Sequence, residues 1–246
     1  MQLTRTLRLT IEYDGTPFRG WAAQPGLPTV EGALRDALTA TFAAYGRLAV
    51  AGRTDAGVHA LGQVASVRVE GGPPTERVAD ALNTRLPDEI SVTGAAEVPA
   101  DFSARRSARS RSYRYRIFNR RTPSPFESRR SWWLAHALDE ERLAVAAALL
   151  RGEHDFCAFT PTQTQHAVFT RHVARAEWIR RGDHLDFEIT ADSFLRHMVR
   201  SLVGTMLDRR PEEIAPLLAG RARGEAGMNA PPWGLYLMSV AYDELS

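Results

Sequence analysis

Hydrophobic positions along the first hundred residues predict a mixed α+β fold. In residues 7–13 and 63–70 they alternate with polar positions, which is typical of a strand with one buried face. In residues 29–42 and 75–86 they recur at helical spacing, Thr29 can cap the first helix, and Thr75 begins the second. Together with short strands expected at about 47–51 and at 90–98, the order is strand, helix, strand, strand, helix, strand.

This order is that of the split βαβ, or ferredoxin-like, arrangement, in which a four-stranded antiparallel sheet carries two helices on one face. RRM modules share it, and the fold alone does not fix a function. The rest of the chain repeats the order loosely, with strands expected at 111–118, 132–134, 173–180, 184–190 and 235–242 and helices at 139–150, 192–208 and 211–218. Asp139 and Asp192 are the expected caps of the first two helices. We therefore expect two related α+β halves, residues 1–106 and 107–246, with the boundary near residues 104–110.

Three side chains of different chemistry, those of Arg53, Asp55 and His59, lie within residues 51–60, between two expected core strands. Two glycines in the same segment permit a turn and a close approach of backbone, so the three groups are expected to be held in a fixed arrangement. A second interpretation is equally open at this point. Asp55 can be a turn-forming residue that bonds its own backbone, and His59 can be structural.

The basic residues are unusual because the chain contains no lysine, so that all 31 of them are arginine. A high genomic GC content would produce this bias without functional pressure. It nevertheless excludes a Schiff-base lysine and a P-loop lysine. Each guanidinium is permanently charged and suits phosphate contacts and base stacking.

Composition and residue spacing also limit which cofactors the protein is expected to bind and where in the cell it is expected. Cys157 is the only cysteine, and the seven histidines lack zinc-ligand spacing, so we expect no metal. No dinucleotide-binding glycine motif follows a strand, and a reaction without a cofactor is favoured. No signal peptide and no apolar stretch of membrane-spanning length is present, so we expect a cytoplasmic protein with no membrane partner.

A strongly basic segment covers residues 103–121 and contains no acid. Its arginines are Arg105, Arg106, Arg109, Arg111, Arg114, Arg116, Arg120 and Arg121. Tyr113, Tyr115 and Phe118 are interleaved with them. Rings that stack on bases beside guanidinium groups that pair with phosphates are what nucleic-acid binding requires. The alternative is a solvated linker followed by an amphipathic strand.

The expected helix 192–208 is apolar around most of its circumference, and the remaining narrow strip holds Arg196, His197, Arg200, Ser201 and Gly204. The strip either faces solvent or faces a wet cleft in which the arginines have partners, because a buried guanidinium needs a counter-charge. In the second case Arg200 would lie opposite Asp55 as its counter-ion.

Residues 52–59, with the sequence GRTDAGVH, resemble the signature of the tRNA pseudouridine synthase A family. Further ordered matches extend the resemblance along nearly the whole chain, at residues 13–16, 20–21, 101–105, 113–115, 197–200 and 234–237. Three positions depart from the family pattern, where Ala22, Ser103 and Ser201 replace the usual glutamine, histidine and asparagine.

The resemblance implies the pseudouridine synthase fold, in which two RRM-like halves with antiparallel sheets flank a catalytic cleft, and a homodimer that acts on tRNA. The implied reaction converts uridine to pseudouridine in the anticodon stem-loop without a cofactor. Asp55 would be the catalytic carboxylate, Tyr113 would stack on the target base, Arg53 would help to extrude it, and Arg200 would pair with Asp55. We further expect His59, Arg105, Arg106, Arg109, Arg111 and Arg114 to bind the substrate.

The chemistry agrees with a carboxylate that works without a cofactor, because nothing is oxidised and no group leaves. The N-glycosidic bond breaks, the base rotates, and a carbon–carbon bond forms at the same sugar carbon. Asp55 can attack the sugar carbon, attack the base or abstract the neighbouring sugar proton, and the sequence does not choose among these routes. Two rival classes remain open, a non-catalytic RNA-binding module and a nucleoside hydrolase.

Overall fold

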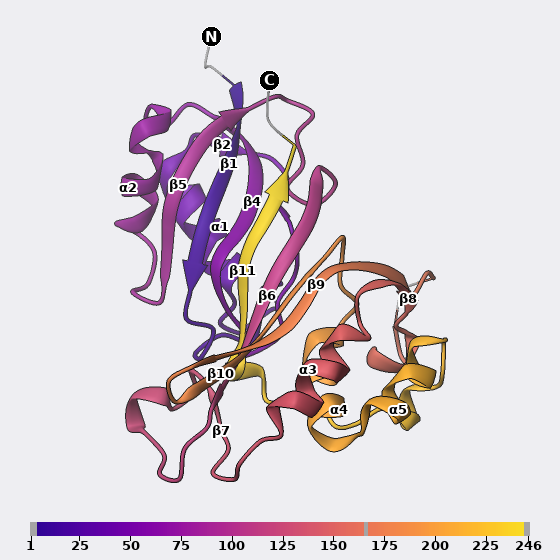
Figure 1. Ribbon diagram of the computed structural model, residues 1–246. Coiled ribbons are helices and arrows are strands. Elements are labelled where there is room, and N and C mark those ends of the chain that lie inside the picture. The colour runs from indigo at the N-terminus through magenta and orange to yellow at the C-terminus, as the bar shows by residue number, and fades with distance from the viewer. Residues whose placement is uncertain (1–3, 165–166, 244–246) are drawn as a thin grey trace. The chain divides into compact units, whose positions relative to one another are not determined.

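A computed structural model describes residues 4–164 and 167–243 and confirms a mixed α+β protein with mostly antiparallel strands (Figure 1). The chain forms two compact units. The first contains the described residues up to Arg109 and those from Leu237 onward, and the second runs from Ser110 to Tyr236. No helix in the described ranges is long and apolar enough to cross a membrane.

The first unit has the element order that the sequence predicts. Its elements are β1 (Thr4–Tyr13), α1 (Val30–Thr41), β2 (Ala44–Tyr45), β3 (Ala49–Val50), β4 (His59–Glu70), α2 (Val78–Asn83) and β5 (Ile90–Val98), with most of β11 (Leu235–Tyr242). The strand order is β5–β1–β4, and β4 also pairs with β2, β3 and β11. The expected second strand is therefore two short strands, and the ferredoxin-like order of the four main strands is confirmed.

The core of this unit lies between the sheet and its helices. Leu7 and Leu9 of β1 and Leu34 and Leu38 of α1 are fully buried. The predicted cap of α1 is confirmed, since the Thr29 hydroxyl accepts a hydrogen bond from the Gly32 amide at 3.2 Å. Figure 1 shows α1 and α2 beside the strands of this unit. A smaller apolar cluster includes Val64 of β4, whose neighbours in sequence, Gln63 and Ala65, point to the other face of the strand.

The helix α2 is shorter than the sequence predicts. It ends at Asn83, whereas the apolar spacing continues to Leu86. The Asn83 side chain accepts a hydrogen bond from the Val92 amide at 2.7 Å and donates one to the Val92 carbonyl at 3.0 Å. This pairing ties the end of α2 to β5, and it stops the helix one turn before Pro87.

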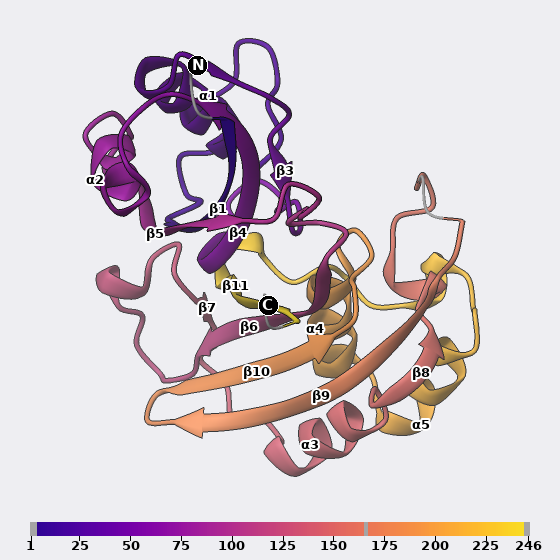
Figure 2. The same ribbon diagram turned by 90° about the horizontal axis from the view of Figure 1, so that it is seen from above.

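The second unit contains a sheet with the order β6–β10–β9–β8, and Figure 2 shows the long hairpin of β9 and β10. Its elements are β6 (Ala108–Phe118), β7 (Trp132–Trp133), α3 (Glu140–Ala148), β8 (Gly152–Asp155), β9 (Thr170–Arg181), β10 (His184–Ala191), α4 (Met198–Asp208) and α5 (Pro211–Ile214). The strand pairs of this sheet are antiparallel, except that β7 runs parallel to β6. The predicted hairpin and the Asp139 cap of α3 are confirmed.

The two faces of this sheet differ in chemistry. Tyr113, Tyr115 and Ile117 of β6 are buried and stand opposite the buried residues Ile189, Phe187 and Leu185 of β10. On the other face Arg114 stands opposite Glu188 and Arg116 opposite Asp186. The alternation that the sequence shows in β6 thus separates an aromatic core face from a charged face.

The start of α4 corrects a prediction. The helix begins at Met198 after His197, which has a left-handed φ of 62°, and Asp192 is not its cap. The Asp192 carboxylate instead accepts hydrogen bonds from the backbone amides of Ser193 and His172. The polar strip on the helix does not simply face solvent either, because Ser201 is fully buried.

Candidate functional site

Asp55 lies in a tight turn between β3 and β4. The Val58 amide donates a hydrogen bond to the Asp55 carbonyl at 3.2 Å, and Gly57 at the third position of the turn has a φ of 76°. A positive φ at this position is what a type II turn requires. The turn predicted from the glycines is therefore present, and it ends where β4 begins at His59.

A buried hydrogen-bond network, which we call the Gln63 brace, fixes the chain on the amino-terminal side of Asp55. The Tyr13 and Thr54 hydroxyl oxygens are 2.7 Å apart. The Gln63 amide nitrogen donates to the Tyr13 hydroxyl at 3.3 Å and to the Gly52 carbonyl at 2.7 Å. Because buried polar groups are costly to leave unpaired, this network holds Thr54, and with it the start of the turn, in one position.

Sequence reasoning missed the Gln63 brace, although one signal for it was present. Gln63 occupies the same face of β4 as Ala65, Val67 and Val69, so an amide stands in register with an apolar row. It is fully buried. A polar side chain at such a position requires internal partners, and these are the turn and Tyr13.

Replacing Tyr13 with phenylalanine is expected to lower the free energy of unfolding by about 1 kcal/mol near neutral pH, because two buried partners lose a hydrogen bond. Burial raises the pKa of the Tyr13 hydroxyl to about 12, although hydrogen bonds with Thr54 and Gln63 lower it. Between pH ~10 and ~12 the unfolded chain loses this proton first, so the stability of the native protein falls as pH rises. The Tyr13→Phe variant should lack this part of the alkaline loss.

Urea unfolding at several pH values measures both effects. Tyr45→Phe is the matched control, because the Tyr45 hydroxyl makes only long contacts at the exposed surface. Equal stability curves for the two variants would contradict a supporting role for the Gln63 brace.

The loop of residues 14–21 lies directly against the turn. The Trp21 amide donates a hydrogen bond to the Thr54 carbonyl at 3.0 Å. A Cβ atom at Gly15 would lie 2.0 Å from the Val58 carbonyl oxygen, and one at Gly20 would lie 2.9 Å from the Thr54 carbonyl oxygen. Only residues without a side chain permit this approach, so the two glycines seat the loop on the backbone of the turn.

His59 joins the same loop to β4. Its Nδ1 atom lies 3.1 Å from the Gly15 amide nitrogen and 3.2 Å from a carboxylate oxygen of Asp14. The two contacts require opposite protonation of Nδ1. We assign Nδ1 as the acceptor from Gly15, because the amide hydrogen has good hydrogen-bond geometry and the ring is only 2% exposed. His59 thereby fixes the position of the loop.

Arg53 and Asp55 differ in exposure. Arg53 is exposed, and among the described residues its guanidinium has no hydrogen-bond or ion-pair partner. Asp55 is half-buried. The turn therefore presents an accessible cation next to a carboxylate that is held in place by its backbone.

Tyr113 and Arg200, both in the second unit, contact other residues of the protein. Tyr113 is 8% exposed, and its ring packs edge-on against Phe194, with centroids 4.9 Å apart. The Arg200 Nε atom donates to the Ala230 carbonyl at 2.8 Å. Burial raises the pKa of Tyr115 well above its usual range, and the charge of Arg200 partly opposes this.

The five predicted RNA-binding arginines occupy different environments. Arg105 and Arg106 are exposed, and Arg109 forms an exposed ion pair with Asp243. Arg111 is 9% exposed and donates to the Asp192 carbonyl at 2.8 Å, while Arg114 pairs with Glu188 at 3.1 Å. The basic run is thus not one continuous face, and its later arginines stabilise the second unit.

Asp186 gives the partly exposed arginines on the charged face of β6 a common buried partner. Its carboxylate is fully buried and lies 2.9 Å from Arg181, 3.5 Å from Arg116 and 3.7 Å from Arg114. A buried carboxylate needs such compensation. These cations come from β6 and β9, so Asp186 and its neighbour Glu188 join three strands.

We expect Glu188→Gln to reduce the acid sensitivity of the protein. Burial raises the pKa of Glu188, but hydrogen bonds from Arg181 and Arg114 outweigh it and lower the pKa below its usual value. A lowered pKa contributes stability that is present above the ordinary value of about 4.3 and is lost as pH falls through the native pKa. Melting temperatures at pH 7 and near pH 4 should differ less for Glu188→Gln than for the native protein.

Glu177→Gln is the matched control, since Glu177 stands opposite Glu188 on β9. A pH dependence that is the same in Glu188→Gln as in Glu177→Gln would contradict the assigned role of Glu188.

In the described part of the chain no cluster of three or more histidine, cysteine, aspartate or glutamate side chains could hold a metal ion.

The chain belongs to the tRNA pseudouridine synthase family, because a family model with this description matches residues 9–105 and 146–243. It is 44% identical to the tRNA pseudouridine synthase A of Rhodopseudomonas palustris over 241 residues, which are 96% of this chain and 97% of that protein. The proteins of the same name from Moorella thermoacetica and Myxococcus xanthus are 43% and 42% identical over 243 residues, covering 96% of this chain and 99% and 91% of their own.

The two matched segments contain the turn of Asp55 with its brace and the helix of Arg200. Tyr113 lies in residues 106–145, between the segments. Among solved structures, a chain from the "Crystal Structure of a Cbf5-Nop10-Gar1 Complex" is similar over 94% of this chain and 48% of its own, with a TM-score of 0.39 and 12% identity.

Proposed function

We propose that this protein isomerises uridine to pseudouridine in the anticodon stem-loop of tRNA, with Asp55 as the catalytic carboxylate and without a cofactor. Membership of the family, with relatives of the same name matched over 96% of the chain, is the observation that carries the proposal. The Gln63 brace supports the assignment of Asp55, because a catalytic group must be held in a fixed geometry. We further propose that it acts in the cytoplasm as a homodimer.

The roles of the other residues follow from what the reaction needs. The target base must leave the stack, which costs a few kcal/mol, and stacking on Tyr113 would offset part of this cost. Arg53 is exposed beside Asp55 and suits contact with the displaced base or its phosphate. Arg200 would pair with Asp55 and keep it ionised, which attack on carbon and proton abstraction both require.

Contacts with the rest of the RNA are assigned to the predicted arginines, whereas His59 is buried and would act through the loop that it fixes. Exposure favours Arg105 and Arg106 as direct phosphate ligands, and the surface pair of Arg109 with Asp243 can exchange for a phosphate. Arg111 and Arg114 have protein partners and would act mainly by shaping the surface.

Tritium release from tRNA labelled at C5 of uridine tests the proposal, because forming the carbon–carbon bond replaces the hydrogen at C5. The purified protein should release tritium with turnover. No release above background, with the RNA otherwise unchanged, would indicate a non-catalytic RNA-binding module. Free uracil among the products would indicate a nucleoside hydrolase instead.

Two arginines near the start of α4 offer a matched test of the counter-ion. If Arg200 keeps Asp55 ionised, Arg200→Ala should lower the turnover of tRNA by roughly 10²-fold or more, the scale of a lost electrostatic contact in an active site. Arg196→Ala, an exposed neighbour, should have little effect. Equal effects of the two substitutions on turnover would count against the pairing.

A further inference from the structure

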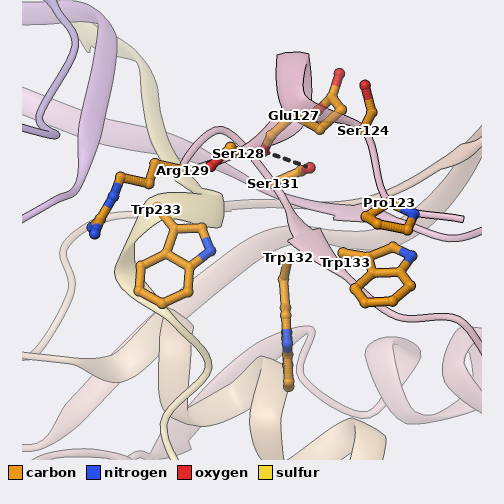
Figure 3. Close-up of a pocket in the computed structure, with 9 residues that line it drawn as sticks. All are labelled: Pro123, Ser124, Glu127, Ser128, Arg129, Ser131, Trp132, Trp133 and Trp233. Carbon is orange, nitrogen blue, oxygen red and sulfur yellow. Dashed lines mark hydrogen bonds between the residues drawn. The ribbon is translucent and has the colours of Figure 1, made fainter.

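A cavity of about 430 Å³ lies in the second unit (Figure 3). Three tryptophans line it, Trp132 and Trp133 of β7 and Trp233, together with Arg129 and three serines. We call this cavity the tryptophan pocket. The chain has only five tryptophans, so most of its indole rings gather at one place.

The position of Arg129 indicates a built arrangement and not a chance hollow. Its guanidinium carbon lies 6.0 Å from the centre of the Trp233 ring, and Figure 3 shows the two side chains together. Its φ of 56° is left-handed, which a non-glycine residue adopts only at some cost. Such strain persists where the surrounding structure enforces it and is concentrated at functional sites.

Trp133 is fixed but accessible. Its indole nitrogen donates a hydrogen bond to the Arg120 carbonyl at 2.9 Å, and 42% of the residue remains exposed. The pocket therefore offers large flat rings and, from Ser128, a hydroxyl group that can donate or accept a hydrogen bond. Flat rings with a few polar groups at the edges suit a planar heterocycle.

The charge around the pocket selects the kind of ligand. Residues 120–130 contain four arginines, Arg120, Arg121, Arg129 and Arg130, and a single acid, Glu127. That acid lies 3.2 Å from His184. Arg120 also pairs with Asp183 at 3.3 Å, and Glu127 lines the pocket. Arg121, Arg129 and Arg130 still leave an excess of positive charge in this segment, which attracts a polyanion. A symmetric contact with a second copy of the chain would instead place the same arginines against each other, which disfavours a second copy as the occupant.

We propose that the tryptophan pocket binds an unpaired nucleobase of the RNA substrate, outside the catalytic turn, while the surrounding arginines contact the adjoining phosphates. Base stacking on tryptophan, a guanidinium beside the stack and backbone phosphates near arginine are the contacts by which single-stranded RNA is held. This inference rests on the proposed function, since it takes tRNA as the ligand. The pocket would supply affinity and register for the RNA and no part of the chemistry.

The test measures the dissociation constant of tRNA for Trp233→Leu and Trp133→Leu. Loss of one stacked base should raise the Kd roughly 5- to 100-fold and leave the turnover at saturating tRNA unchanged. Trp233→Phe retains a stacking ring and should recover most of the affinity. Phe126→Ala is the matched control, because Phe126 is 85% exposed in the same loop and does not line the pocket.

Photocrosslinking of the native protein gives an independent readout that does not depend on the variants folding. A tRNA transcript containing 4-thiouridine is irradiated on the protein, and the crosslinked peptides are identified by mass spectrometry. Crosslinks to residues 123–133 or to Trp233 would support the proposal. Crosslinks only to other residues, together with unchanged Kd values, would overturn it. A lower sedimentation mass of the tryptophan variants with unchanged affinity for tRNA would also overturn it, because the pocket would then bind a second copy of the chain.

Failure of the pocket and failure of the proposed function give different results. If pseudouridine forms and the tryptophan variants bind tRNA as tightly as the native protein, the pocket assignment falls and the function stands. If the variants bind tRNA more weakly but the native protein makes no pseudouridine, the pocket stands and the function falls.

Discussion

Replacing Asp55 with asparagine should lower the rate of pseudouridine formation by at least ~10²- to 10⁴-fold, the contribution that a positioned acid–base group makes. Asparagine has nearly the same shape, and the hydrogen bond of the turn is made by the backbone carbonyl of residue 55, so the turn should remain. What is lost is the charged oxygen that attacks carbon or removes a proton. Single-turnover conversion of labelled tRNA measures the rate, and filter binding should show an unchanged Kd.

Asp36→Asn is the matched control, because it removes a carboxylate from the exposed surface of α1. It should leave the rate unchanged. Activity of Asp55→Asn within a few-fold of the native rate would show that the essential group lies elsewhere, whatever the tRNA affinity.

Gly15→Ala should disturb the same site through the backbone. The added Cβ atom would lie 2.0 Å from the Val58 carbonyl oxygen, and a backbone atom cannot move aside as a flexible side chain can. Overpacking of this kind costs about 1–3 kcal/mol in the free energy of unfolding. Because the displaced atoms belong to the turn of Asp55, turnover should fall as well, by roughly 10²-fold for a shift of ~1 Å.

Gly94→Ala is the matched control, because it also adds a methyl group at a glycine but causes no clash. A Cβ atom at Gly94 in β5 would meet nothing within 4 Å. Thermal unfolding and turnover should both stay near the native values for this variant. If Gly15→Ala were as stable and as active as Gly94→Ala, the close seating of residues 14–21 on the turn would be unimportant.

Much of the fold could be predicted because its elements are locally encoded. The period-two strands, the Thr29 and Asp139 caps and the last strand are all present. The start of α4 could not be predicted in this way, because the Asp192 side chain bonds to His172 on another strand. A capping residue in the sequence is available to a helix only if no tertiary partner takes it.

In the candidate site too, features encoded by neighbouring residues could be predicted and features that depend on distant residues could not. The glycines and polar groups of residues 51–60 predicted the turn, whereas the brace depends on Tyr13 and Gln63, which are 50 residues apart. The run of arginines predicted nucleic-acid binding from local composition. Its acidic partners Asp186 and Glu188 come from β10, and such long-range pairing leaves no trace in the local charge.

Mapping pseudouridine in an unmodified tRNA transcript incubated with the purified protein tests the central claim most directly. The account predicts new pseudouridine in the anticodon stem-loop, formed by the native protein and absent after incubation with Asp55→Asn. Uridines that remain unchanged throughout the transcript, or release of free uracil in place of pseudouridine, would contradict it.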